Sequence, residues 1–149
     1  MTDNYDNDNL RQRQIRLGIE EGDGIANMVK TADALAAFKA AGFELLEYED
    51  LADEPVTHNL RPWYWPLDGS SWKYVQSVGD FLTTWRMSNV GRVVTHGLIL
   101  TLETLRIAAP GTARMSESLQ TAARALVQGG REKLFTPMFL MVGRKPTEA

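Results

Sequence analysis

The chain has 149 residues, 44% of them hydrophobic, which suits one domain or part of one. Its formal net charge of −3 provides no general attraction to nucleic acid or to anionic lipid, and the lack of cysteine excludes disulfides, thiolate zinc sites and cysteine nucleophiles. The acidic, Asn-rich start shows no targeting signal, and no apolar stretch predicts a transmembrane helix. Any contact with a membrane is therefore expected to be peripheral.

The N-terminal third predicts two short helices and a strand. Apolar spacing indicates a helix over residues 10–21, which Gly22-Asp23-Gly24 is expected to break. A second helix is predicted over residues 31–41, and Gly42 stands where a left-handed C-terminal cap is common. Residues 43–48 follow as a strand. The side chains expected to form the buried faces of these helices are Ile15, Ile19, Leu35 and Phe38.

The middle of the chain predicts a loop and two helices. Residues 53–71 combine prolines, glycine and several aromatic side chains, which is typical of a loop. Two apolar stripes at helical spacing follow, and Pro110-Gly111 is expected to end the second. The first stripe consists of Trp72, Val75, Val78, Leu82 and Trp85, and the second of Val90, Val94, Leu98, Leu102 and Leu105.

A last helix and a last strand are predicted at the C-terminal end. The helix starts at Thr112 or Ser116 and stops at Gly129-Gly130. Its inward side chains are expected to be Leu119, Ala123, Leu126 and Val127. Residues 134–144 predict a strand in which regular pairing begins at Met138, because the proline before it has no N–H to donate. Two strands do not make an independent sheet, so the predicted sheet is incomplete.

Three separate tracts carry the most specific information in the chain. They are Met1-Thr2-Asp3-Asn4-Tyr5-Asp6, Ile19-Glu20-Glu21-Gly22-Asp23-Gly24-Ile25 and Gly129-Gly130-Arg131-Glu132-Lys133-Leu134-Phe135-Thr136-Pro137-Met138. In this order they resemble the C-terminal part of the sterol 24-C-methyltransferase family, and most closely its fungal members. Shorter tracts support the resemblance, namely Gly42-Phe43-Glu44-Leu45-Leu46, Glu49-Asp50-Leu51-Ala52, Trp63-Tyr64-Trp65-Pro66-Leu67 and Arg144-Lys145-Pro146. The front part of the family's polypeptide, which binds the methyl donor, has no counterpart among these residues.

The resemblance implies an α/β fold, which is α+β when this chain is taken alone. Residues 1–52 would end the core of a class I S-adenosylmethionine-dependent methyltransferase fold, residues 53–130 would form a mainly helical insertion, and residues 131–146 would contribute the last core strand. The two predicted strands would be the final antiparallel pair of the sheet. The segment Met1-Thr2-Asp3 would be the tail of the preceding strand.

The resemblance also implies a reaction, the transfer of methyl from S-adenosylmethionine to C-24 of a Δ24 sterol in ergosterol-type biosynthesis. Methylation of a carbon–carbon double bond generates a carbocation, which carboxylates and aromatic faces stabilise until a base removes a proton. Glu20 and Asp23 have this chemistry and are the predicted catalytic residues. The alternative is a solvated carboxylate at the end of a helix for Glu20 and a turn-forming aspartate for Asp23. Ala26 stands where the family tract has proline.

Aromatic side chains provide the predicted substrate contacts. Trp63, Tyr64, Trp65 and Trp72 would wall a flat, apolar sterol cavity, and their alternative role is to anchor the loop or to contact another protein. Thr136 and Met138 would add a hydroxyl and a flexible side chain, or would only start the last strand. His58 and His96 stand alone without metal-ligand spacing, so no metal site is predicted.

The partners implied by the resemblance are a sterol, S-adenosylmethionine as co-substrate and further copies of the same chain as a homo-oligomer, with no nucleic acid. The implied location is the endoplasmic reticulum membrane surface or a lipid droplet, with peripheral membrane contact. A second hypothesis from a different class stays open, that of a non-catalytic lipid-binding or oligomerisation module derived from such an enzyme.

Overall fold

A computed structural model describes residues 1–52 and 61–146 as a mixture of helices and one small sheet, an α+β arrangement. The helices are α1 (Leu10–Asp23), α2 (Thr31–Ala40), α4 (Val78–Met87), α5 (Asn89–Thr104) and α6 (Thr112–Arg131), and the strands are β1 (Glu44–Asp50) and β2 (Phe139–Arg144). Short 3₁₀ turns, η1 and η2, occupy Trp65–Leu67 and Trp72–Tyr74. His58, singled out in the sequence as a lone histidine, lies outside the described residues.

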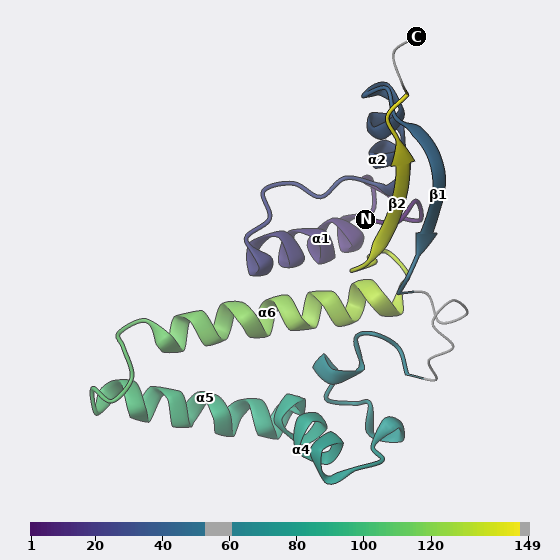
Figure 1. Ribbon diagram of the computed structural model, residues 1–149. Helices are drawn as coiled ribbons and strands as arrows, with labels where there is room; N and C mark the ends of the chain where they lie inside the picture. The colour runs from purple at the N-terminus through teal and green to yellow at the C-terminus, as the bar shows by residue number, and fades with distance from the viewer. Residues whose placement is uncertain (53–60, 147–149) are drawn as a thin grey trace.

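Strands β1 and β2 form the predicted antiparallel pair, with Glu44 opposite Arg144 and Asp50 opposite Phe139. An ion pair of 2.6 Å between the side chains of Glu44 and Arg144 joins the far end of the pair. The sheet stands at one end of the molecule, while α5 and α6 extend away from it as an antiparallel arm (Figure 1). Pairing begins at Phe139, one residue after the predicted start, because Met138 contributes only its carbonyl, which accepts from the Leu51 N–H at 2.9 Å.

The core lies where α1 packs against the C-terminal half of α6. Its buried side chains are Met1, Tyr5, Ile15, Ile19, Met28, Ala125 and Leu134, with Leu126 and Phe135 packed against them. At Gly22 a Cβ would lie 2.1 Å from the Cβ of Ala122, so a glycine is required for this close approach. The helix continues through Gly22 to Asp23, two residues later than predicted, and Gly24, with a φ of 67°, is its C-terminal cap.

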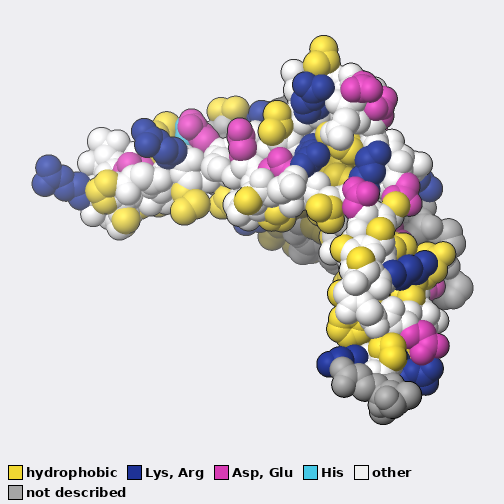
Figure 2. Space-filling model, turned by 90° about the horizontal axis from the view of Figure 1, so that it is seen from above, with side chains coloured by type: hydrophobic (Ala, Val, Ile, Leu, Met, Phe, Trp, Pro, Cys, Tyr) yellow, Lys and Arg dark blue, Asp and Glu magenta, His cyan; other side chains and the backbone are white. Residues whose placement is uncertain are grey.

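The outer helices turn their apolar side chains toward solvent. In α5 the residues that face α6 include the charged or polar Arg92, His96 and Glu103, which are buried or half-buried, whereas Val93 is 73% exposed and Leu98 is 58% exposed. Seen from above, the molecule has an angular outline with hydrophobic side chains distributed over both arms (Figure 2). Within the described residues, no helix is long and apolar enough to cross a membrane.

Four expectations about the helices and the first residues were wrong. The stripe from Trp72 does not form one helix, because Trp72 lies in a 3₁₀ turn and α4 starts only after Ser77, whose hydroxyl accepts from the Asp80 N–H at 3.1 Å. Leu119 is 55% exposed rather than inward, because it lines an open hollow opposite Met87 and Thr95 and no side chain fills that hollow. Gly129-Gly130 does not stop α6.

The glycine pair lies inside α6 because other side chains pack directly on it. A Cβ at Gly130 would lie 2.3 Å from the ring of Tyr64, and one at Gly129 would lie 3.3 Å from Ile19. The fourth error concerns the first residues, which do not form a strand. Instead the Thr2 N–H donates to Leu134 O at 2.8 Å, and the Met1 carbonyl accepts from the Thr31 N–H at 2.9 Å.

Candidate functional site

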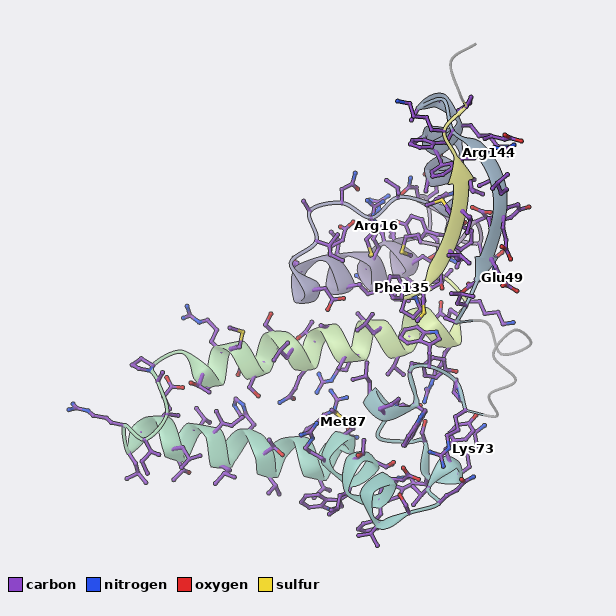
Figure 3. The ribbon with its side chains drawn as sticks, in the orientation of Figure 1. Arg16, Glu49, Lys73, Met87, Phe135 and Arg144 are labelled. Atoms are coloured by element: carbon purple, nitrogen blue, oxygen red, sulfur yellow. The ribbon has the colours of Figure 1, made fainter. Side chains whose placement is uncertain are left out.

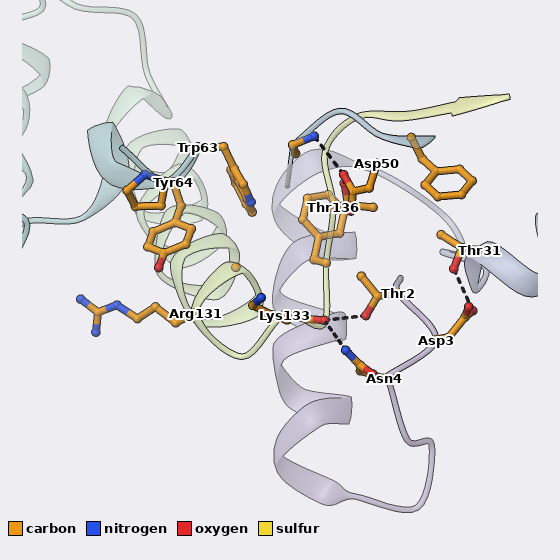
Figure 4. Close-up of a pocket in the computed structure, with 15 residues that line it drawn as sticks. Thr2, Asp3, Asn4, Thr31, Asp50, Trp63, Tyr64, Arg131, Lys133 and Thr136 are labelled. Carbon is orange, nitrogen blue, oxygen red and sulfur yellow. Dashed lines mark hydrogen bonds between the residues drawn. The ribbon is translucent and has the colours of Figure 1, made fainter. Parts of the chain in front are cut away.

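An open pocket of about 490 Å³ lies where the N-terminal segment, the ends of both strands and the C-terminal end of α6 meet (Figure 4). We call it the junction pocket, and its lining includes Thr2, Asp3, Asp50, Trp63, Tyr64 and Thr136. Two of the three informative tracts of the sequence reach it, although one ends at Asp6 and the other begins only at Gly129. The pocket is thus built by tertiary contacts and not by one local motif.

The N-terminal side of the junction pocket is a hydrogen-bonded turn. The hydroxyl of Thr2 donates to the carbonyl of Lys133 at 2.6 Å, and the amide of Asn4 donates to the same oxygen at 3.5 Å. Lys133 has a φ of 54°, a left-handed conformation that turns the chain directly after α6. These bonds hold the first tract against the third.

Asp3 connects the same wall to the start of α2. Its Oδ1 accepts from the Thr31 hydroxyl at 2.7 Å and from the Ala32 N–H at 3.0 Å. The hydrogen bond from Thr31, followed by the one from Ala32, lowers the pKa of Asp3 below its usual value. Asp3 therefore places a negative charge at the rim of the pocket and caps the first turn of α2.

The opposite side is an aromatic wall formed by Trp63, Tyr64 and Phe135. The rings of Trp63 and Tyr64 meet edge to face with centroids 5.5 Å apart, and Trp63 meets Phe135 at 5.8 Å. Phe135 lies where the chain leaves α6 toward β2 (Figure 3). Gly130 beneath the wall has no side chain, and this lets the rings lie directly on the helix. The wall offers flat apolar surface beside polar groups, as small-molecule sites commonly do.

Asp50 and Thr136 close the end of the pocket nearest the sheet. The Thr136 hydroxyl donates to Asp50 Oδ1 at 2.6 Å, and the Ala52 N–H donates to the same atom at 2.9 Å. The pair joins the end of β1 to the segment that enters β2. It supplies a second carboxylate at the pocket, across from Asp3 (Figure 4).

Comparison with known proteins shows which protein family this chain resembles. The family model for the sterol methyltransferase C-terminal region matches residues 82–147. A sterol 24-C-methyltransferase of Gibberella zeae is 58% identical over 98% of the chain and 37% of its own length. Those of Aspergillus fumigatus and Yarrowia lipolytica are 55% and 47% identical over 98% and 99% of the chain and 38% of their own lengths.

The chain belongs to the sterol 24-C-methyltransferase family. It spans less than two fifths of the length of these relatives. No solved structure matches it. The resemblance found in the sequence is confirmed, including its restriction to the C-terminal region of the family.

Three of the predicted substrate-binding residues lie in the junction pocket, and three do not. Trp63, Tyr64 and Thr136 line it. Trp65 instead lies under the Arg61 guanidinium, 4.9 Å from its carbon to the ring centroid, and Trp72 is half-exposed beside Phe81 with ring centroids 5.8 Å apart. Met138 is 55% exposed. The family's predicted aromatic cluster is therefore divided between two surfaces.

The two predicted catalytic carboxylates lie outside the pocket, at the end of α1. Glu20 Oε1 accepts from Arg16 Nε at 2.7 Å and from the Met28 N–H at 2.8 Å. Burial raises the pKa of Glu20, but the hydrogen bonds from Met28 and Arg16 outweigh it and bring the pKa below its usual value. Asp23 is exposed. Glu20 thus joins the end of α1 to the segment at Met28. The catalytic role of both carboxylates stays a prediction.

Sequence reasoning missed four residues that shape the pocket: Asp3, Asp50, Gly130 and Phe135. Each stands inside a tract that was recognised, yet no local rule indicated its task. The glycine pair carried the only usable signal, since a glycine within a helical pattern can mark close packing as well as a stop. The two interpretations of this glycine pair, a helix stop or a close contact, differ only in whether another side chain lies opposite the glycines in the fold.

Neither a metal nor the family's methyl donor has an evident site in the described part of the chain. In residues 1–52 and 61–146, no three His, Asp or Glu side chains are grouped to hold a metal ion, and His96 Nε2 has only Glu117 near it, at 3.6 Å. In the class I fold that the resemblance implies, S-adenosylmethionine would be held at a glycine-rich turn between a parallel strand and a helix. The two described strands are antiparallel, so the residues present do not fit the donor.

Proposed function

We propose that this chain forms the C-terminal part of an enzyme that transfers methyl from S-adenosylmethionine to C-24 of a Δ24 sterol in ergosterol-type biosynthesis. The observation that carries the proposal is the 58% identity, over 98% of the chain, to a protein named sterol 24-C-methyltransferase. Identity at this level over the whole chain supports a shared reaction as well as a shared fold. The donor would be held by other parts of such an enzyme.

The proposal extends to the architecture of the whole enzyme. Residues 1–52 would end a class I methyltransferase core, residues 53–130 would form the mainly helical insertion, and residues 131–146 would supply the last core strand. The antiparallel pair of β1 and β2 supports this division, because two strands alone leave a sheet edge unpaired. Neighbouring strands of the core would cover that edge.

Within this enzyme the junction pocket would form part of the sterol site. Its volume of about 490 Å³ lies within the range of small-molecule sites, roughly 300–1,000 Å³. Trp63, Tyr64 and Thr136 would contact the sterol there, and the aromatic faces would favour positive charge on it. Trp65, Trp72 and Met138 would belong to a second contact surface, completed by the rest of the enzyme.

The two carboxylates of α1 would act in the same reaction. Asp23 is exposed at a left-handed turn, so its carboxylate is accessible to a ligand or to another segment. Glu20 is held by Arg16 and Met28, and those contacts favour a role in which it fixes the turn beside Asp23. Together they would stabilise the cation that methylation creates.

The exposed apolar faces of α4 and α5 support self-association, so the proposal includes a homo-oligomer with peripheral membrane contact. Residence at the endoplasmic reticulum surface or on lipid droplets is proposed from the family resemblance. Sedimentation velocity and fluorescence microscopy of the tagged enzyme test these two points. A monodisperse monomer, or a protein spread evenly through the cell, would contradict them.

The central experiment measures methyl transfer from labelled S-adenosylmethionine to a Δ24 sterol by the longer enzyme that contains this chain. Asp23→Asn is nearly isosteric, and it is expected to lower kcat roughly 100-fold while leaving sterol binding little changed. Trp63→Ala is expected to raise KM for the sterol, whereas Asp8→Asn, an exposed change at a distance from the pocket, leaves both constants unchanged.

Failure of the enzyme to methylate any Δ24 sterol would remove the catalytic proposal. Sterol binding without turnover would favour the alternative of a lipid-binding module. An Asp23→Asn variant with the parent's kcat and a lowered melting temperature would assign Asp23 to the turn instead of to the chemistry.

A further inference from the structure

A second hollow, of about 300 Å³, lies between α6, the start of α5 and the loop that follows η1. Its lining includes three arginines, Arg92, Arg124 and Arg131, with one carboxylate, Asp68. We call it the arginine hollow. It adjoins the junction pocket through Arg131, which lines both, although the Arg131 side chain points away from the junction pocket in Figure 4.

Arg92 is a buried cation that forms no hydrogen bond with a carboxylate among the described residues. Only 8% of the residue is exposed. Its guanidinium donates to three backbone carbonyls, those of Met87 at 2.8 Å, Gln120 at 3.3 Å and Leu67 at 3.2 Å. A guanidinium has five N–H groups, so these bonds fix the side chain without using all its donors. Its positive charge is held rigidly at the wall of the hollow.

The remaining charges of the hollow do not cancel. Arg131 Nη2 donates to Asp68 Oδ2 at 2.5 Å, and this pair accounts for the single carboxylate. Arg124 is exposed and forms no ion pair within residues 1–52 and 61–146. Burial, and next the charge of Arg124, lower the pKa of Arg92, whereas the charge of Asp68 raises it and offsets only part of the effect. Three arginines against one carboxylate leave the hollow with an excess of two positive charges.

The backbone around the hollow adds to its positive character and fixes its shape. Helix α5 begins at its edge with Asn89, and the first N–H groups of a helix favour anions. Met87 lies at the junction of α4 and α5, between these helices and α6 (Figure 3). A Cβ at Gly69 would lie 2.2 Å from the Met87 carbonyl, so the loop presses against this junction and forms a tight floor.

We propose that the arginine hollow binds a phosphate group, held between Arg92 and Arg124 beside the neutralised Arg131–Asp68 pair. A phosphate dianion would match the two uncompensated charges, and arginine is well suited to phosphate oxygens because its donors are planar and forked. The group has two possible sources, free phosphate or the headgroup of a phospholipid. The site goes beyond the proposed function, since methyl transfer to a sterol involves no phosphate.

The test compares two single-charge variants in α6. Arg124→Gln removes an arginine that lines the hollow, and Arg114→Gln removes an exposed arginine near the other end of the helix, away from the hollow. Calorimetric titration with inorganic phosphate is expected to show binding to the parent protein that falls at least about tenfold in Arg124→Gln, as for loss of a charge-assisted hydrogen bond. Arg114→Gln is expected to bind like the parent.

A second arm distinguishes the two sources. Flotation with phosphatidylcholine vesicles, with and without phosphatidic acid, reports binding to a lipid phosphate. Binding to inorganic phosphate that Arg124→Gln weakens assigns the site to free phosphate, and binding only to phosphatidic acid vesicles, weakened by the same variant, assigns it to a headgroup. Circular dichroism confirms that both variants fold.

Three results would overturn the proposal. They are no binding in either arm, equal loss in Arg124→Gln and Arg114→Gln, and acetate binding as tightly as phosphate. The last would point to a protein carboxylate as the missing counter-charge. None of these outcomes depends on methyltransferase activity, so the proposed function can succeed or fail independently.

Discussion

The two ends of α6 have very different environments. At its C-terminal half, α1 and the N-terminal segment cover the helix, and Ile19 and Leu134 are almost fully buried. At its N-terminal half, α5 is the neighbour, and that helix directs Arg92, His96 and Glu103 inward while its three valines and two of its three leucines are exposed. Both regions contain apolar stripes of similar length. The contrast teaches that hydrophobic periodicity predicts an apolar face but does not say which element covers it.

The largest expected effect tests whether the covered end and the exposed end of this helix pair also differ in how much their apolar side chains stabilise the fold. Ile19→Ala removes a fully buried side chain and is expected to lower the free energy of unfolding by about 3–4 kcal/mol. Val93→Ala, on the exposed face of α5, is expected to change it by less than about 0.5 kcal/mol. Urea denaturation measures both. A loss at Val93 close to that at Ile19 would mean that α5 buries its apolar face, for example against another copy.

A change at Gly130 tests the close approach beneath the aromatic wall. Gly130→Ala places a Cβ 2.3 Å from Tyr64, so the ring must move, at a cost of as much as about 3 kcal/mol. Gly97→Ala is the matched control in α5, where a Cβ meets no atom within 4 Å, and it should stabilise the helix by up to about 1 kcal/mol. Thermal melts that show the same sign for both variants would contradict this packing.

Asp68, which pairs with Arg131 at the C-terminal end of α6, should make the stability of the protein depend on pH. Burial raises the pKa of Asp68, but hydrogen bonds from Ser70, Arg131 and Ser71 outweigh it and lower the pKa from 3.8 to about 2. Since the folded pKa is depressed, the stabilisation of about 2 kcal/mol is complete above about pH 4 and is lost as the pH falls to about 2.

Asp68→Asn is therefore expected to lower the free energy of unfolding by about 2 kcal/mol at pH 7 and to flatten its slope between about pH 4 and pH 2. Asp8→Asn changes an exposed aspartate and should keep the slope of the parent. Denaturation curves across this pH range provide the measurement. A parent-like slope in Asp68→Asn would show that the carboxylate is not held as described.

The smallest effect separates the two carboxylates of α1. Glu20→Gln weakens the bonds to Arg16 and Met28 and is expected to destabilise the fold by about 1–2 kcal/mol. Asp23→Asn should change stability by less than about 0.5 kcal/mol, because Asp23 is exposed. Equal melting temperatures for the two variants would remove the structural role assigned to Glu20.

Local signals in the sequence predicted much of the secondary structure. Gly24 and Gly42 lie at helix ends, as predicted, and both have positive φ angles. The antiparallel strand pair was also predicted correctly, with pairing delayed past Pro137. Such signals are readable because caps, turns and prolines act over a few residues. They failed at Trp72, where the apolar spacing suited a helix but the chain forms a 3₁₀ turn ahead of the Ser77 cap.

The sequence by itself determined the family, since 58% identity to a sterol 24-C-methyltransferase leaves its tracts recognisable one by one. It also predicted the strand pair and most of the helices, and it fixed which residues carry charge or aromatic surface. Only the tertiary structure decided that Trp63, Tyr64 and Thr136 share a pocket, that Gly130 supports a ring, and that Arg92 is buried. The physical reason is that these facts depend on contacts between segments far apart in the chain, and local propensity carries no information about them.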